Sequence, residues 1–517
     1  MANRCAGRYL IGISQGMANL GAVSIVGVFQ MYYAGGLTSS WWYLMGMPVQ
    51  LIIGITGWVT YRFRQTRALT MAQFFEMRYT KKFRVFAGSI CFISGIINFG
   101  IFPAVGANFF INFCGFSDNF SFFGLMLPTY PILALGLVSI ALYFAMVGGQ
   151  IAVMTTDFLQ ATFFNVTLLS ILAFLLFKFP LSEIFEGLMI APEQASKVNP
   201  FKVNNADGFD FWYFAILFFG QIYAWRAWQG SQAYNSSAES AHEAKMGVIV
   251  GFLREWAFFG CLTILPLVAY MIMHHPNYTT QASQIQMVLE QISSEQVRNQ
   301  MTTPVAMTTF IPTGLIGAFV LLMFAAFLTT HNSYLHSWGT ILVQDVIIPL
   351  RGKQLTPKKH LLYLRLAILS VGIFIYLFSL LFRQTQHILL YTMISGAIWT
   401  GGAGSVIVGG LYWKRGSTVA AYSAIIVGAV VAIAGLVLDQ VWQSLYQTSF
   451  PLGFKWMSAL SMVSAIAIYV IVSLRSKGPT FDLDRMLHRG KYAIEDQIKN
   501  VGELPKKTSL IFRLKNM

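Results

Sequence analysis

Long apolar stretches separated by short polar connections run along nearly the whole chain. Each is about 20 residues or longer, the length that a helix needs to cross a bilayer. The alternation of apolar and polar residues that marks a transmembrane barrel strand is missing. Because hydrocarbon offers no water to backbone groups, we expect each stretch to be a helix. The twelve stretches lie near residues 9–36, 41–62, 85–113, 124–147, 157–179, 210–228, 247–274, 310–335, 361–382, 387–412, 417–438 and 453–474.

The composition agrees with a multi-pass membrane protein. Of 517 residues, 56% are hydrophobic and 11% are charged, whereas about a quarter of an ordinary soluble domain is charged. So much apolar surface exceeds what a soluble core can bury. No phosphate-binding loop, HExxH, GxSxG or kinase motif is present, so we do not expect an enzyme. The four cysteines stand far apart without metal-binding spacing; they are Cys5, Cys91, Cys114 and Cys261.

The basic residues predict the orientation of the spans. The net charge is +15, and with both termini in the cytoplasm 29 of the 35 Lys and Arg residues fall on inner segments. Such an excess is typical of cytoplasmic connections. The charge therefore indicates topology in a cell membrane, plasma or bacterial inner, and not binding to nucleic acid. The outer loops 180–209 and 275–309 are long and polar. The second loop has an amphipathic helix pattern at Ile285, Val288, Leu289 and Ile292.

Several short motifs occur in a fixed order along the chain. With this set the sequence resembles the sodium/solute symporter family, which includes sodium/glucose, proline and sialic acid symporters, from about residue 8 to 493. The order and spacing of the motifs carry the resemblance, since each motif alone is weak. The motifs are Met17-Ala18-Asn19-Leu20-Gly21, Thr70-Met71-Ala72-Gln73 with Arg78-Tyr79, Gly148-Gly149-Gln150 with Thr156-Asp157 and Gln160, Phe310-Ile311-Pro312-Thr313 with Thr329-Thr330 and Asp345, and Phe481-Asp482-Leu483-Asp484 with His488-Arg489-Gly490.

The resemblance implies an all-α polytopic fold with an inverted five-helix repeat of the leucine-transporter type and extra C-terminal helices. Each unit has five helices, which is an odd number. In the topology derived from the charges, the second unit therefore enters the membrane from the opposite side and is inverted. Relatives carry one more helix before the first core helix. That helix is not in this sequence, so either the sequence starts too far downstream or the helix is dispensable. The expected parts are a cytoplasmic amino-terminal loop (1–8), the first repeat (9–179), an extracellular loop (180–209), the second repeat (210–412), two peripheral transmembrane helices (413–474) and a cytoplasmic basic tail (475–517).

The first apolar stretch is a candidate for a broken helix. It is rich in glycine, which favours either unwinding, with backbone carbonyls freed for an ion, or close helix packing. A hard cation such as sodium prefers oxygen ligands. The resemblance implies that the carbonyls of Met17 and Leu20 are two sodium ligands.

The eighth stretch supplies the other candidate ligands. Ala326, Thr329 and Thr330 are spaced i, i+3 and i+4, so they share one helix face. The residues alone leave open whether the two hydroxyls bond to the preceding helical turn instead. The resemblance implies that the Ala326 carbonyl and the Thr329 and Thr330 side-chain oxygens complete a site for Na⁺.

Asp157 is one of few acidic residues within the apolar stretches. An intramembrane carboxylate marks an ion path by default, although a helix N-cap after the Gly148-Gly149 loop is an equal alternative. The resemblance implies a second ion site or the inner exit route at Asp157. It also implies that Asn19 and Ser24 contact substrate. Ser24 stands where sugar-transporting relatives carry histidine, which argues against a glucose-type pocket.

Three further polar residues have two interpretations each. Arg226, at the inner end of the sixth stretch, either pairs with an anionic substrate or extends to the headgroups, and the second interpretation is favoured. His331 and His336 follow the proposed sodium face. We interpret both as gate or packing residues, because no third metal ligand is near.

The sequence therefore predicts a sodium-coupled symporter that imports a small polar organic solute by alternating access. Its expected partners are the solute, Na⁺ and the lipid bilayer, and a monomer is expected to suffice. One alternative is a sodium-independent or proton-coupled carrier of the same fold. Another is a solute sensor that does not transport.

Overall fold

The computed structural model describes residues 7–18, 20–68, 70–122, 124–147, 149–202, 208–230, 239, 241–352, 355–448 and 450–492. About 80% of the chain is helical. In the described part, nine helices are long and apolar enough to cross a membrane, and two shorter apolar helices accompany them. The prediction of a helical multi-pass membrane protein is confirmed, while the count of twelve spans stays a prediction.

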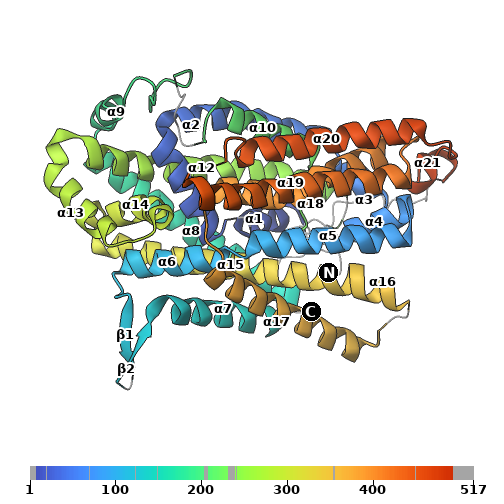
Figure 1. Cartoon of the computed structure of the whole chain (residues 1–517), viewed down its shortest axis with the longest axis horizontal. Coiled ribbons are helices and arrows are strands. Elements are labelled where there is room, and N and C mark those ends of the chain that lie inside the picture. The colour runs from blue at the N-terminus through green and yellow to red at the C-terminus, as the bar shows by residue number, and fades with distance from the viewer. Residues whose placement is uncertain are drawn as a thin grey trace, which may run out of the picture.

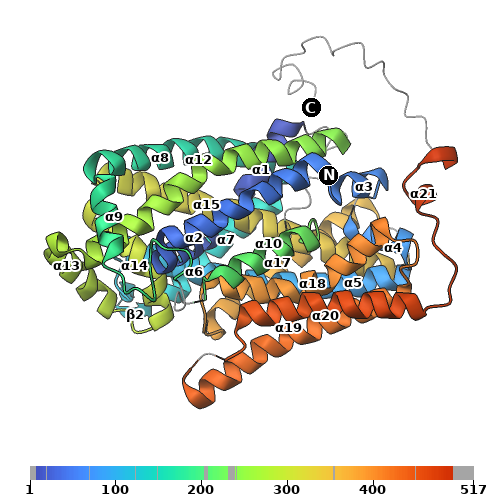
Figure 2. The same cartoon turned by 90° about the horizontal axis from the view of Figure 1, so that it is seen from above.

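The predicted inner and outer segments lie at opposite ends of the molecule. In both views α9 and α13 are at the left end, and α3, α4 and α21 are at the right end (Figure 1, Figure 2). The first half contains α1 (Arg8–Ala18), α2 (Ala22–Thr56), α3 (Thr60–Gln65), α4 (Met71–Arg78), α5 (Lys81–Phe99), α6 (Phe102–Cys114), β1 (Asn119–Phe122), β2 (Leu125–Pro128), α7 (Thr129–Val147), α8 (Gly149–Lys178) and α9 (Leu181–Met189). The second half contains α10 (Phe211–Tyr223), α12 (Ala241–His274), η2 (Pro276–Tyr278), α13 (Thr279–Glu290), α14 (Glu295–Phe310), α15 (Thr313–Ile341), η3 (Leu342–Ile347), α16 (Ile348–Arg351), α17 (Pro357–Leu381), α18 (Ile388–Tyr412), α19 (Thr418–Tyr446), α20 (Phe454–Arg475), α21 (Leu483–Met486) and η4 (Gly490–Tyr492).

The long helix α2 consists of two halves that meet at Gly36. The backbone of Gly36 has φ +60° and ψ −146°, outside the helical region, and glycine reaches positive φ without steric cost. Gly12 of α1 and Gly54 near the end of α2 both lie beside residues 247–251 of α12. Because Gly12 and Gly54 lie beside the same part of α12, the chain reverses direction between these two glycines. Gly36 therefore separates the first two predicted spans.

Several predicted spans differ from the observed helices. The stretch 85–113 forms α5 and α6, which are interrupted at Gly100 and Ile101, and a proline near the start of α6 removes a backbone donor there. The stretch 210–228 is helical only to Tyr223, and 310–335 continues to Ile341 and through η3 to Arg351. Apolar composition alone does not reveal where a helix is interrupted.

Two elements lie at the predicted outer end. The amphipathic helix predicted in 275–309 is α13, with Ile285 and Leu289 buried and Val288 exposed. Strands β1 and β2 form an antiparallel hairpin in which Asn119 pairs with Pro128. This hairpin was not predicted, and it takes the first residues of the predicted span 124–147.

Small residues bring α18, α19 and α20 together. A methyl group on Gly402 of α18 would lie 2.4 Å from the Cα of Ile425 in α19, and one on Gly401 would lie 2.0 Å from Ser461 Oγ in α20. Lipid tails are as apolar as the side chains, so close packing of this kind holds membrane helices together. These glycines accordingly leave no room for larger residues.

The motif around Arg78 holds α4 on the inner end of α18. The buried Arg78 guanidinium donates to the carbonyls of Gly410, Trp413 and Gly416 at 2.9–3.2 Å. The last carbonyls of a helix lack backbone donors, and Arg78 supplies donors at the end of α18. Two further contacts support it, since the Tyr79 hydroxyl donates to the Val406 carbonyl at 2.9 Å and hydrogen-bonds to the Tyr469 hydroxyl at 2.8 Å.

Replacing Gly36 with alanine should destabilise the fold through the reversal turn. A methyl group there would be strained by the positive φ and would lie 2.6 Å from the Lys197 carbonyl oxygen, so we expect a loss of about 2–4 kcal/mol. Gly115→Ala is the matched control, because Gly115 also has positive φ but nothing lies within 4 Å of the added methyl. Thermal unfolding midpoints in one detergent measure both variants, and equal shifts would contradict the role of Gly36.

Candidate functional site

The first predicted span is broken where the motif Met17–Gly21 lies. Helix α1 ends at Ala18 and α2 begins at Ala22, while Gly21 has an extended backbone at φ −83° and ψ 168° and no side-chain cap bond. The carbonyls in the last turn of a helix have no intrahelical donor. The candidate ligands Met17 and Leu20 therefore sit in the last turn of α1 and in the break itself. Asn19 lies outside the described residues.

Helix α15 presents its hydroxyl face to this break. A methyl group on Gly21 would lie only 2.6 Å from Thr330 Oγ1, so the Thr330 side chain is in direct contact with the unwound backbone. Ala326, Thr329 and Thr330 are 0–2% exposed. The two halves of the candidate sodium site are thus brought together in space, although about 300 residues separate them in sequence.

Helix α8 contributes a third wall. Thr329 donates a hydrogen bond to Gln160 Oε1, which leaves the lone pairs of its own oxygen for a cation. Asp157 is buried and lies three residues before Gln160, so both are on one face of α8. Because α8 begins at Gly149, Asp157 is in the helix interior, and the N-cap interpretation is wrong.

A cavity of about 410 Å³ lies next to the break. Ser24 lines it from the first turn of α2, and Tyr334, one helical turn after Thr330, lines it from α15. None of its lining residues carries a formal charge in the part of the chain that the structure describes. The polar side chains of the lining include Ser24, Asn98, Gln221, Trp228, Tyr334 and Thr392.

Hydrogen bonds fix most of these polar groups. Asn98 Nδ2 donates to Ser395 Oγ at 2.9 Å and to the Thr392 carbonyl at 3.0 Å. Trp228 Nε1 donates to the Tyr334 hydroxyl at 3.1 Å. Gln221 Oε1 is buried and accepts no hydrogen bond from the described residues. An unpaired buried acceptor is unfavourable, so Gln221 is available to a donor on a bound solute.

A sequence profile described as the sodium:solute symporter family matches residues 1–428. The chain belongs to this family. A comparison with curated protein sequences found no significant match. The symporter is similar to the structure of a Na⁺-coupled sialic acid symporter in a substrate-bound outward-open state, with a TM-score of 0.68, 17% identity and 92% of each chain covered. It is also similar to a nucleobase-cation-symport-1 family transporter in a closed conformation with bromovinylhydantoin bound, with a TM-score of 0.51, 11% identity and 95% of this chain and 97% of that chain covered.

The family and the structural similarity establish the general activity and the fold. The protein is a sodium-coupled symporter with Na⁺ as its coupling ion, and it has the fold of leucine-transporter-type carriers. It is a multi-pass membrane protein that binds a small solute and sodium. Its family and structural neighbours are transporters, not enzymes.

The remaining predicted polar residues lie away from the cavity lining of the symporter. Arg226 follows α10 with φ +65°, and its Nε donates to Thr60 Oγ1 at 3.2 Å. His331 stacks on Phe327 with ring centroids 3.7 Å apart. Its Nδ1 lies 2.8 Å from the Phe327 carbonyl, which can only accept, so this nitrogen donates. His331 is thus packed within α15, and His336 is partly buried farther along the same helix.

Several residues that line the candidate site were not predicted from the sequence. Gln160 was part of a motif but was given no role, and its spacing of three from Asp157 was the available signal. Asn98 and Tyr334 had no signal, since a single polar residue in an apolar stretch does not reveal which helix it faces. Their positions became clear only when α5, α15 and α18 were packed together.

Gly21→Ala should weaken sodium binding to the symporter. The added methyl would overlap Thr330 Oγ1 and force the two halves of the site apart, so we expect the half-saturating sodium concentration to rise about tenfold or more. Gly317→Ala is the control, because Gly317 is on α15 and nothing lies within 4 Å of its added methyl. Sodium-dependent thermal stabilisation of the purified protein measures both. An unchanged response of Gly21→Ala would contradict the proximity of Thr330.

Gln160→Leu should also lower sodium affinity, because Thr329 loses the acceptor that orients its hydroxyl. We expect a rise of roughly three- to tenfold in the half-saturating sodium concentration, which corresponds to one hydrogen bond. Gln160→Glu keeps an acceptor at this position and should retain the affinity. The sodium titration described for Gly21→Ala applies, and equal losses for leucine and glutamate would contradict a role as acceptor.

Proposed function

We propose that the symporter binds Na⁺ between the α1–α2 break and α15, and that this ion organises a solute site in the adjoining cavity. The proposed ligands are the carbonyls of Met17, Leu20 and Ala326 and the side-chain oxygens of Thr329 and Thr330. The contact between Thr330 and Gly21 carries the proposal. It puts a hydroxyl oxygen beside carbonyls that lack helical partners, and hard cations prefer such oxygens.

Asp157 is proposed to serve a second ion or the inner exit route. It is buried on the same face of α8 as Gln160, which bonds to Thr329. A buried carboxylate inside a membrane favours a cation nearby. Its position supports a path for sodium that runs along α8.

The solute is proposed to bind in the cavity lined by Ser24, with Asn19 as a second contact. The lining is largely apolar and uncharged, and Gln221 offers an unpaired acceptor. We therefore propose a small polar organic solute that is neutral and donates hydrogen bonds. The related symporter binds sialic acid, an acid, whereas a carboxylate here would find no cationic partner among the described lining residues.

Transport by alternating access follows from this arrangement. Sodium stabilises one conformation of the broken helix and so shifts the equilibrium between the outward-facing and inward-facing states. At −100 mV one inward charge contributes about 2.3 kcal/mol, or roughly 50-fold in accumulation. We place the symporter in a cell membrane, with repeats at 9–179 and 210–412. One chain should suffice, because Ser24 of α2, Asn98 of α5 and Tyr334 of α15 come together from the same chain to line the cavity.

Thr330→Ala should raise the half-saturating sodium concentration about tenfold or more while the protein still folds, because the substitution removes one ligand oxygen and little volume. Thr340→Ala is the matched control, because it removes a buried hydroxyl from the same helix away from the break. Solute uptake in sodium medium against choline medium, and sodium-dependent thermal stabilisation, are the measurements. If Thr330→Ala and Thr340→Ala have the same sodium response, the ion is placed wrongly.

A further inference from the structure

The inner end of α15 contains a π-helical turn with an unusual backbone requirement. The turn η3 covers Leu342–Ile347, and the N–H of Ile348 bonds to the Val343 carbonyl. The carbonyl of Gln344 would normally receive an N–H from residue 348 or 349. The first is used by Val343, and the second belongs to Pro349, which has no N–H. The Gln344 carbonyl therefore depends on a donor from outside the helix.

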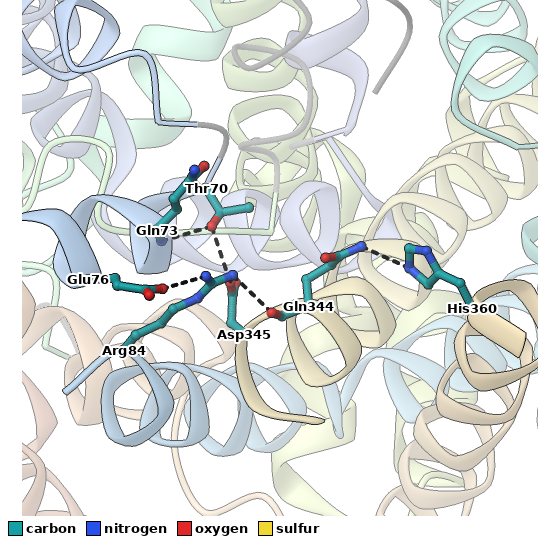
Figure 3. A network of polar contacts seen from close by, with 7 residues as sticks. All are labelled: Thr70, Gln73, Glu76, Arg84, Gln344, Asp345 and His360. Atoms are coloured by element: carbon teal, nitrogen blue, oxygen red, sulfur yellow. Dashed lines mark hydrogen bonds and ion pairs between the residues drawn. The ribbon is translucent and has the colours of Figure 1, made fainter. Parts of the chain in front are cut away.

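Arg84 of α5 supplies that donor. Its Nη2 donates to the Gln344 carbonyl at 2.9 Å and to Asp345 Oδ1 at 2.9 Å, and its Nη1 donates to Glu76 Oε2 at 2.7 Å. Figure 3 shows the guanidinium between these three acceptors. Charged groups in such an arrangement form strong, directional bonds.

The same cluster includes the connection before α4. Thr70 Oγ1 donates to Asp345 Oδ1 at 3.2 Å and accepts from the Gln73 N–H at 3.0 Å, so Thr70 caps α4 and contacts α15 at once (Figure 3). Asp345 is 2% exposed, and a methyl group on Gly88 of α5 would lie 3.1 Å from its Cβ. The inner end of α15 is therefore held at close range from two elements.

The π turn determines how the two parts of α15 are rotated. Thr330 and Asp345 are fifteen positions apart, a distance of about 22 Å along the helix, and the helix between Thr330 and the π turn is continuous. Conversion of the π turn to ordinary α-helix would rotate one part against the other by roughly 100°. With Asp345 held in place, that rotation would turn Thr330 away from the break at Gly21.

We propose that Arg84 is a positioning residue for sodium coupling: it stabilises the π turn of α15 and thereby keeps Thr330 facing the α1–α2 break. The inference rests on the sodium site proposed above. An ion pair that only stabilises the fold would lower the thermal midpoint and leave the sodium affinity unchanged. A positioning residue changes the sodium affinity at a distance, through one rigid element.

The test is a sodium titration of Arg84→Gln, with NaCl replaced by choline chloride and the thermal midpoint of the purified protein recorded. We expect the half-saturating sodium concentration to rise about tenfold. Asp439→Asn is the control. It alters an equally buried carboxylate that lies away from α15 and is bonded to Thr385, Gln386 and the Phe450 N–H. We expect this variant to change the half-saturating sodium concentration by less than about twofold.

A second substitution makes the test specific to the π turn. Pro349→Ala restores a backbone N–H that can bond to the Gln344 carbonyl, so Arg84→Gln/Pro349→Ala should recover at least about threefold of the lost affinity. Adding Arg84→Gln to Thr330→Ala should have little further effect, because both act on one site. If Arg84→Gln does not purify, Arg84→Lys replaces it, since lysine keeps the charge but not the forked geometry.

Two results would overturn the role of Arg84 while the proposed sodium site stands. In the first, the half-saturating sodium concentration of Arg84→Gln is within about twofold of wild type, while that of Thr330→Ala is raised. The proposed sodium site then stands, but Arg84 has no role in it. The other is a loss that Pro349→Ala does not recover, which assigns the effect to charge and not to the π turn. If Thr330→Ala itself has no effect, the proposed sodium site fails, and the inference fails with it.

Discussion

The architecture depends on one constraint: backbone carbonyls that are exposed inside a membrane need partners. Hydrocarbon supplies none, so a helix can be interrupted only where protein groups, water or ions meet the freed atoms. The break between Ala18 and Ala22 creates this need at the centre of the molecule. Thr330 reaches the break from α15, and a sodium ion between the two would satisfy both. Binding of the coupling ion and stability of the broken helix are then the same interaction.

The same requirement explains the buried charges elsewhere. Arg78 donates to the last carbonyls of α18, and Arg84 donates to a carbonyl of the π turn. Asp439 of α19 accepts a hydrogen bond from the Phe450 N–H in the loop that follows this helix, at 3.2 Å. Arg78, Arg84 and Asp439 thus each pair with backbone at a helix end, an irregular turn or a loop. Such pairs are costly to break, because the remaining partner would be buried alone.

The proposed solute cavity follows a different rule from the proposed ion site. Its described lining has no formal charge, and most of its polar groups are already bonded to one another, as Asn98 is to Ser395. Only a solute with few, well-placed polar groups gains from such a lining. Because Tyr334 lies one turn beyond Thr330, movement of α15 at the sodium site reaches the cavity directly. This continuity gives a physical route for coupling between the ion and the solute.

Much of the fold could be predicted from the sequence because bilayer thickness sets the length of each span, and basic residues set its orientation. One helix face of the candidate sodium site could also be named, since i, i+3 and i+4 spacing places Ala326, Thr329 and Thr330 together within one helix. The glycines before residue 36 indicated a break without fixing its position. The interruption at Gly100, the β hairpin and the π turn were not predictable, because apolar composition is the same on both sides of each.

The sequence by itself determined the helical multi-pass class of the protein, since the length of each apolar stretch depends on local composition, and its resemblance to the family predicted the sodium donor set. Only the tertiary structure decided that Thr330 contacts Gly21, that Gln160 receives the Thr329 hydroxyl and that Arg84 serves the Gln344 carbonyl. Each of these contacts joins helices that are far apart in the chain. Packing of small residues sets the relative rotation of these helices, and a local sequence pattern does not predict it.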